Sequence, residues 1–260
     1  MRKRLATRSP LKDSPLRLPG QSIQDEIDRI YETRVVQPVV LTIGFILLAI
    51  IQWSYALLPA RPNPWITSAI ALLALLYTVV TVIRVSRKMR SLALARDGER
   101  IVAEHIDRLK EQGAAVIHDV VGDGFNIDHV ILSSKGVFVA ETKTRSKPKR
   151  GSPTVSYDGK VLRVDGLTPD RDPVAQARAN ARWVANGLRE STGKSFPTKP
   201  VVLFPGWFVE PIPPNLDIWI LEPKALPTFI ANEPNRISDE DLHLAVYHLS
   251  RMVRPRKDAA

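Results

Sequence analysis

Two long apolar stretches dominate the hydropathy pattern of the first hundred residues. Residues 35–58 and residues 65–83 contain no charged side chain. About 20 consecutive apolar residues suffice to cross a bilayer as a helix, so each stretch is predicted to be a transmembrane helix. Residues 59–64 between them carry three prolines and are predicted to be a short external loop. A pair of buried core helices is the alternative, and the length and lack of charge of both stretches disfavour it.

The basic residues that flank these stretches predict their orientation. Residues 1–34 form a polar, basic tail in which Arg29 and Arg34 lie close to the first stretch, and the loop carries only Arg61. A basic linker, 84–96, follows the second stretch and contains Arg84, Arg87, Lys88, Arg90 and Arg96. Because cytoplasmic flanks carry an excess of Lys and Arg, we expect a multi-pass protein of the cell membrane with both termini in the cytoplasm. Neither stretch has a charged centre, which disfavours a transporter or channel.

The remainder of the chain alternates between helical and extended patterns. Helices are predicted where apolar residues recur at helical spacing, and strands where short apolar runs lie between turn residues. The predicted helices are 22–34, 97–112, 173–188 and a last one that begins at Ser238. The predicted strands are 114–121, 127–132, 137–142, 155–157, 161–164, 200–204 and 217–221. This order predicts an α/β domain from about residue 97 to residue 222.

Two of these strands bring together a cluster of charged side chains. A turn at Ser133-Ser134-Lys135-Gly136 gives an antiparallel register in which Asp128 faces Glu141, and strand alternation returns Lys143 to the same face. Both faces of this hairpin are otherwise apolar, so two carboxylates there are unfavourable unless they are paired or bind a cation. A divalent metal ion is the simplest compensation. The alternative is a Glu141–Lys143 ion pair with Asp128 at a fraying strand end.

Composition adds a preference for anionic partners. The net charge is +10 and the pI is about 10.0, which favours nucleic acid or an anionic membrane surface. A basic run follows the charged cluster and could hold a phosphate backbone: Lys143, Arg145, Lys147, Lys149 and Arg150. The absence of cysteine excludes disulfides and thiolate metal sites. The histidines have no metal-ligand spacing and are interpreted as structural or solvated: His105, His118, His129, His243 and His248.

Three short motifs carry a resemblance to a known family. Gly98-Glu99, residues 126–130 (NIDHV) and residues 136–143 (GVFVAETK) resemble the NERD (nuclease-related) domain, which is similar to the PD-(D/E)xK restriction-endonuclease-like superfamily. The resemblance implies a central mixed sheet flanked by helices and a Mg²⁺-dependent (or Mn²⁺-dependent) phosphodiesterase site. Ile127 stands where the superfamily motif has proline, which leaves the fold in place and puts activity in question.

The resemblance also implies a role for each residue of the site. Asp128 and Glu141 match the metal-binding carboxylates, and Lys143 matches the catalytic lysine. Glu99 matches the acidic residue on the first helix, with Glu104 as a less favoured alternative. Gln176 stands where the superfamily often has a glutamine, and a surface polar residue is the alternative for it.

We therefore expect a membrane-anchored, cytoplasm-facing nuclease-like protein that hydrolyses nucleic acid, with DNA favoured over RNA as the expected substrate. Its nuclease-like domain would span 97–209, and a C-terminal extension with a strand and a helix would span 210–260. The alternative is a catalytically inactive module that binds nucleic acid or a protein while tethered to the bilayer.

Overall fold

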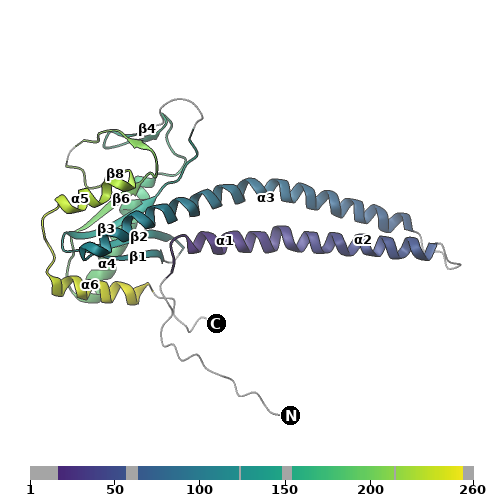
Figure 1. Cartoon of the computed structure of the whole chain (residues 1–260), viewed down its shortest axis with the longest axis horizontal. Helices are drawn as coiled ribbons and strands as arrows, with labels where there is room; N and C mark the ends of the chain where they lie inside the picture. Colours follow the sequence, from purple (N-terminus) through teal and green to yellow (C-terminus); the bar gives the residue numbers. More distant parts are fainter. Residues whose placement is uncertain (1–16, 57–63, 123, 148–153, 214, 254–260) are drawn as a thin grey trace, which may run out of the picture. The chain divides into compact units, whose positions relative to one another are not determined.

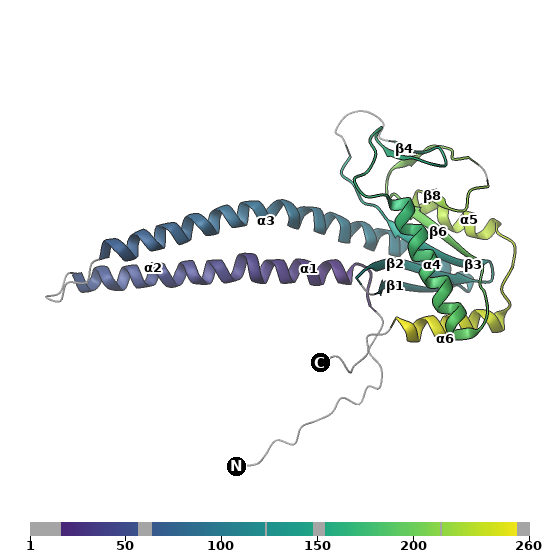
Figure 2. The ribbon, with the colours of Figure 1, turned by 180° about the vertical axis from the view of Figure 1, so that it is seen from behind.

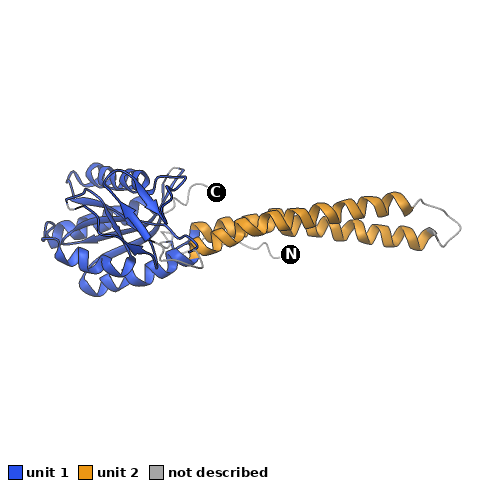
Figure 3. Cartoon of the chain, turned by 90° about the horizontal axis from the view of Figure 1, so that it is seen from above, with its two compact units in different colours: residues 1–21, 97–260 blue, residues 22–96 orange. Residues whose placement is uncertain are grey.

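The computed structural model describes residues 17–56, 64–122, 124–147, 154–213 and 215–253. The chain separates into two compact units (Figure 3). Residues Ser22–Arg96 form one unit, and Met1–Gln21 together with Asp97–Ala260 form the other. The second unit is therefore discontinuous in sequence. Each unit has internal contacts of its own.

The unit Ser22–Arg96 is helical, as the hydropathy pattern predicts (Figures 1 and 2). Its elements are α1 (Gln21–Tyr31), a π-helical turn (Glu32–Val36), α2 (Gln37–Ala56) and the first part of α3 (Pro64–Asp107). Of the predicted external loop 59–64, only Pro64 lies within the described residues, and it begins α3.

Helices α2 and α3 are joined by polar contacts inside this unit. The hydroxyls of Thr42 and Thr78 are buried and lie 2.6 Å apart, and Trp53 Nε1 donates to Ser68 Oγ at 2.8 Å. Only 11% of the most apolar window of each helix is buried, whereas a core helix would be mostly covered. Both helices are long and apolar enough to cross a membrane.

No irregular linker follows the second apolar stretch. Residues 84–96 are helical and continue α3, because this segment lacks proline and glycine and is rich in good helix formers. The predicted helix 97–112 is the last part of α3 followed by a 3₁₀ turn, Arg108–Gln112. Gly113 ends it with φ 83°, as the sequence predicts.

The second unit contains the mixed sheet that the resemblance implies. Its strands are β1 (Ala115–Val121), β2 (Asn126–Ser133), β3 (Gly136–Thr142), β6 (Thr198–Leu203) and β8 (Trp219–Leu221). They lie in the order β1-β2-β3-β6-β8. Strand β2 pairs antiparallel with both β1 and β3, while β6 runs parallel to β3 and β8 runs parallel to β6.

Helices cover both faces of this sheet (Figures 1 and 2). On one face, Val130 and Val139 pack in a core cluster with Val184 and Leu188 of α4 (Pro173–Thr192) and Leu249 of α6 (Asp239–Met252). The other face packs against the end of α3 and against α5 (Leu226–Asn232). The strands are therefore buried on both sides, which explains their nearly continuous apolar sequence.

A smaller sheet has the order β5-β4-β7. The predicted strands 155–157 and 161–164 form an antiparallel hairpin of β4 (Thr154–Tyr157) and β5 (Leu162–Val164). In its turn, Asp158 Oδ1 accepts the backbone N–H groups of Lys160 and Val161. Strand β7 (Phe208–Val209) was not predicted, because two residues are too few to show a strand period.

The segment expected as a C-terminal extension belongs to the same compact unit as the sheet. Strand β8 forms one edge of the main sheet, and Ala245 and Leu249 of α6 lie in its core. Ser238, where the sequence predicts this helix to begin, caps α6 by accepting the Asp241 N–H at 3.2 Å. A 3₁₀ turn, Pro223–Ala225, precedes α5.

Candidate active site

The β2–β3 hairpin has the predicted register. The ladder of paired residues ends with His129 opposite Ala140, and the same register places Asp128 opposite Glu141. At this position the strands no longer pair. Instead, the backbone N–H of Thr142 donates to Asp128 Oδ2 at 2.6 Å. The Asp128 carboxylate therefore joins the ends of the two strands and is fixed beside Glu141.

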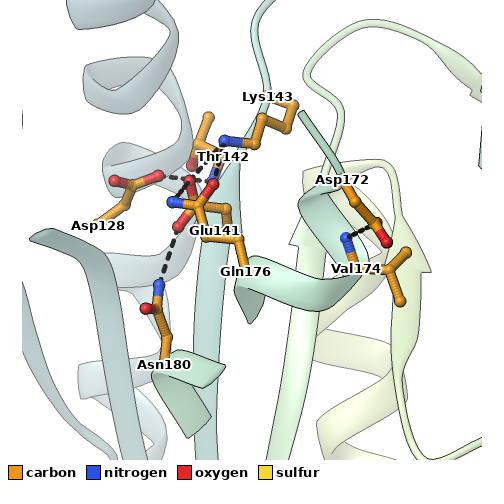
Figure 4. A network of polar contacts seen from close by, with 8 residues as sticks. All are labelled: Asp128, Glu141, Thr142, Lys143, Asp172, Val174, Gln176 and Asn180. Atoms are coloured by element: carbon orange, nitrogen blue, oxygen red, sulfur yellow. Dashed lines mark hydrogen bonds and ion pairs between the residues drawn. The ribbon is translucent and has the colours of Figure 1, made fainter. Parts of the chain in front are cut away.

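Glu141 lies at the centre of a polar network (Figure 4). Its side chain is buried, and its Oε1 accepts from Lys143 Nζ at 2.7 Å and from Gln176 Nε2 at 2.7 Å. Its Oε2 accepts from Asn180 Nδ2 at 3.1 Å. Lys143 Nζ also donates to Gln176 Oε1 at 3.0 Å. The ammonium group is thus held between a carboxylate and an amide.

Helix α4 supplies both amides. Asp172 caps its N-terminus by accepting the N–H groups of Val174 and Ala175, and Pro173 is at the first turn. Gln176 and Asn180 are four residues apart and therefore share a face of this helix. The resemblance pointed to Gln176. Asn180 was missed, although its spacing from Gln176 could have indicated it.

Glu99 is brought to the sheet by a close approach of α3. A Cβ placed on the neighbouring Gly98 would lie 1.8 Å from Thr144 Oγ1, so only glycine fits there. Glu99 is buried and accepts a backbone hydrogen bond from Gly20. Glu104, the alternative on the same helix, is exposed. The structure therefore places Glu99, and not Glu104, at the sheet.

The acidic groups of this region repel one another. Burial raises the pKa of Glu99 to about 7, with further contributions from the charges of Asp119 and Glu141. Burial also raises the pKa of Asp128 well above its usual range, and the charges of Glu141 and Glu99 add to this. Burial raises the pKa of Glu141 above its usual value, and the nearby Lys143 ammonium offsets part of this rise. These carboxyl groups therefore occupy one buried region that has an excess of negative charge.

Asp119 is an acidic residue that the sequence analysis did not single out. It is buried in β1 at φ 50°, and the β1–β2 register places it opposite Asp128. Its Oδ2 accepts from Arg17 Nε at 2.6 Å, and its Oδ1 accepts from Asn126 Nδ2 at 3.3 Å. Positive φ in a non-glycine residue is uncommon and occurs more often at functional sites. The segment before α1 therefore contributes a cation to this region.

The sequence of this region matches a known family. Residues 94–205 match the nuclease-related domain family, NERD. No curated protein and no solved structure matches the chain. The matched range contains Glu99, Asp128, Glu141, Lys143 and Gln176, so all five residues expected in the site lie in the nuclease-related domain.

Beyond Lys143, the described part of the basic run lies at the surface of the nuclease-related domain. Arg145 and Lys147 are exposed, and the carbonyl of Arg145 accepts from Trp207 Nε1 at 3.4 Å. Lys149 and Arg150, which were expected to bind nucleic acid as well, lie outside the described residues.

Two of the five histidines form a buried pair beside the site. His118 Nδ1 and His129 Nδ1 lie 2.8 Å apart, and His118 Nε2 lies 2.9 Å from Asp107 Oδ1. Burial lowers the pKa of His118, and it lowers the pKa of His129 to about 3. The pair is therefore neutral at pH 7. This agrees with the structural interpretation of these two residues.

The site has suitable donor atoms for a hard cation, although it is not a preformed metal cage. Among the described residues, no three His, Cys, Asp or Glu side chains are arranged to hold a metal ion as they stand. Carboxylate oxygens are nevertheless the ligands that Mg²⁺ and Mn²⁺ prefer. A cation would offset the burial and the neighbouring negative charges that together raise the pKa of Asp128. Glu141 already accepts three hydrogen bonds, so it would share or exchange one of them on binding a metal.

Proposed function

We propose that this protein is a Mg²⁺-dependent (or Mn²⁺-dependent) nuclease that hydrolyses phosphodiester bonds, with DNA as the preferred substrate. The observation that supports this most is the cluster of the buried Glu141 with the partly buried Asp128 and Lys143 within a nuclease-related domain. An acidic cluster with a fixed ammonium group suits phosphodiester hydrolysis, because the reaction needs both a cation site and stabilisation of developing negative charge.

Each polar residue has a role in this proposal. Asp128 and Glu141 would hold the metal ion, and Glu99 would assist from α3. Bound Mg²⁺ would polarise the phosphodiester and lower the pKa of water. The Lys143 ammonium would orient the attacking water or stabilise charge on the phosphate. Gln176 would position Lys143 and Glu141, because its amide contacts both.

Cleavage should be measured with the full chain in detergent micelles, using labelled DNA and either Mg²⁺ or Mn²⁺. We expect Asp128→Asn and Lys143→Ala to lower the rate by about 100-fold or more, the usual effect of losing a group aimed at transition-state charge. Glu104→Gln is the matched control, because it removes an exposed carboxylate from α3 and should leave the rate unchanged.

If both Asp128→Asn and Lys143→Ala still cleave DNA at the wild-type rate, this cluster is not the catalytic site. Salt-sensitive DNA binding by the wild type without turnover under either metal would instead identify a non-enzymatic binding module.

We further propose that residues 35–58 and 65–83 anchor the protein in the cell membrane with both termini in the cytoplasm. The length and apolar character of α2 and α3 support this, as does the concentration of basic residues outside the loop between them. The nuclease-related domain would then act at the cytoplasmic face.

The absence of cysteine from the chain allows a direct test of orientation. In intact cells, a membrane-impermeant maleimide should label Asn63→Cys in the loop. It should label Ser146→Cys, in an exposed part of the nuclease-related domain, only after permeabilisation. The opposite pattern would show that the termini and the loop lie on the reverse sides of the membrane. Equal labelling of both residues without permeabilisation would exclude the proposed orientation.

A further inference from the structure

An exposed aromatic side chain lies on the smaller sheet. Phe208 of β7 is 65% exposed, whereas Trp207 before it is buried and Val209 after it packs against the core. Strand alternation explains this difference, since successive side chains point to opposite faces. Phe208 pairs with Thr154 of β4 and therefore lies on the outward face of the sheet.

The outward face around Phe208 carries groups that can bind phosphate and sugar. Thr154 and Ser156 are only partly buried, while the alternate residues of β4 are buried. Arg163 of β5 pairs with Ser156 across the sheet and is exposed. Hydroxyl and guanidinium groups are common donors to nucleic-acid backbones.

Three cations connect the candidate active site to this sheet. Lys143, Arg145 and Lys147 occur at every second position, and we call them the basic row. Lys143 lies in the Glu141 network, while Arg145 and Lys147 are exposed. Such a row can follow a phosphate backbone from the surface to the site.

Contacts with residues 203–207 fix the basic row beside the chain that leads to Phe208. The Lys143 N–H donates to the Leu203 carbonyl at 2.8 Å, which anchors the start of the row to the end of β6. Further along, Trp207 Nε1 donates to the Arg145 carbonyl. Lys147 Nζ lies 3.8 Å from where a Cβ on Gly206 would be. The row therefore runs next to residues 203–207 and reaches the turn just before Phe208.

We propose that the basic row and Phe208 form a track that binds single-stranded nucleic acid and leads it to the active site. Single-strand sites combine a cationic groove with aromatic side chains on which bases stack. Stacking on Phe208 requires an unpaired base, because the faces of bases in a duplex are already stacked on one another. Binding to the track does not depend on cleavage, whereas the direction of the strand toward Lys143 rests on the proposed nuclease activity.

The track can be tested by fluorescence anisotropy with the full chain in detergent and EDTA, which prevents metal-dependent cleavage. The probes are a labelled 20-nucleotide oligothymidylate and a duplex of the same length. We expect Phe208→Ala to weaken binding of the single strand about 5- to 150-fold, the range for loss of one stacked base, and to leave the duplex unaffected. Phe208→Trp should restore the affinity.

Two comparisons separate stacking from nonspecific effects. Leu167→Ala is the matched control, because Leu167 is 69% exposed and bridges Val164 on the same sheet, yet it cannot stack on a base as an aromatic ring does. The slope of the logarithm of the binding constant against the logarithm of the salt concentration should become shallower by about 0.7 for Arg145→Ala, and by the same amount for Lys147→Ala. Phe208→Ala should leave this slope unchanged.

Unchanged single-strand affinity in Phe208→Ala would overturn the proposal, as would an equal loss for the duplex. Loss of binding to phosphatidylserine vesicles without loss of oligonucleotide binding would identify Phe208 as a membrane contact instead. If the wild type binds the oligonucleotide through Phe208 but no metal supports cleavage, the track stands and the nuclease activity fails.

Discussion

Replacing Glu99 by glutamine should stabilise the metal-free protein at neutral and alkaline pH. Burial and neighbouring carboxylates raise the pKa of Glu99 from 4.5 to about 7. One pKa unit corresponds to 1.36 kcal/mol, so keeping this group ionised in the folded protein costs about 3 kcal/mol. Glutamine has the same shape and can still accept the Gly20 N–H, but it carries no charge.

The effect should depend on pH in a defined direction. A carboxyl group whose pKa is higher in the folded state binds more protons when folded, so the wild type loses stability as pH rises from 4.5 to about 7. The advantage of Glu99→Gln should be absent below pH 4.5, grow across this window and be complete above pH 7.

Thermal unfolding of the full chain in detergent and EDTA would measure this difference. For a unit of this size, 1 kcal/mol shifts Tm by about 2–4 °C, so we expect Tm to rise by about 6–12 °C at pH 8. Glu104→Gln, which changes an exposed carboxylate on the same helix, should change Tm little at any pH. A Tm difference for Glu99→Gln that is the same at pH 4.5 and pH 8 would refute the electrostatic explanation.

Three further outcomes follow from other contacts. Arg17→Ala should lower stability by about 1–3 kcal/mol, because it leaves the buried Asp119 carboxylate without this cation. Thermal melts should show that adding Asp119→Asn recovers most of this stability. The pKa of His129 is about 3 in the folded protein and 6.5 ordinarily, so the wild type loses about 3 kcal/mol of stability between pH 6.5 and pH 4. His129→Asn should lessen this loss, and urea midpoints that fall equally in wild type and variant between these pH values would contradict the explanation. Gly98→Ala should destabilise the protein by about 1–3 kcal/mol by overpacking and should reduce cleavage, since its Cβ would meet the Thr144 side chain. If adding Thr144→Gly does not restore stability, this clash is not the cause.

The hairpin that carries Asp128 and Glu141 could be predicted because its register depends on local features. Two apolar runs of similar length and a short turn allow one pairing that buries both faces, and the ladder follows it. The position of Lys143 then follows from strand alternation. The sequence did not show that pairing stops before Asp128, since this depends on the Thr142 N–H finding a carboxylate instead of a carbonyl.

The remaining site residues depend on contacts between distant segments. Asp119 and Arg17 are 102 positions apart, and neither has neighbours that indicate the other. The sequence also gave no sign of the positive φ of Asp119, because aspartate rarely adopts it within a strand. Asn180 could have been predicted as a site residue from its helical spacing relative to Gln176. Its contact with Glu141, however, depends on the direction in which α4 crosses β3, and the sequence does not determine that direction.

The contacts of Arg17 and Gly20 restrict how the chain can be threaded through a bilayer. These residues precede both apolar helices, while their partners Asp119 and Glu99 follow them. If one helix crossed the membrane and the other did not, about 30 Å of hydrocarbon would separate the partners. The ion pair with Asp119 can form only when the number of crossings between its two residues is even. A folded nuclease-related domain that retains this ion pair therefore requires both helices to cross or neither.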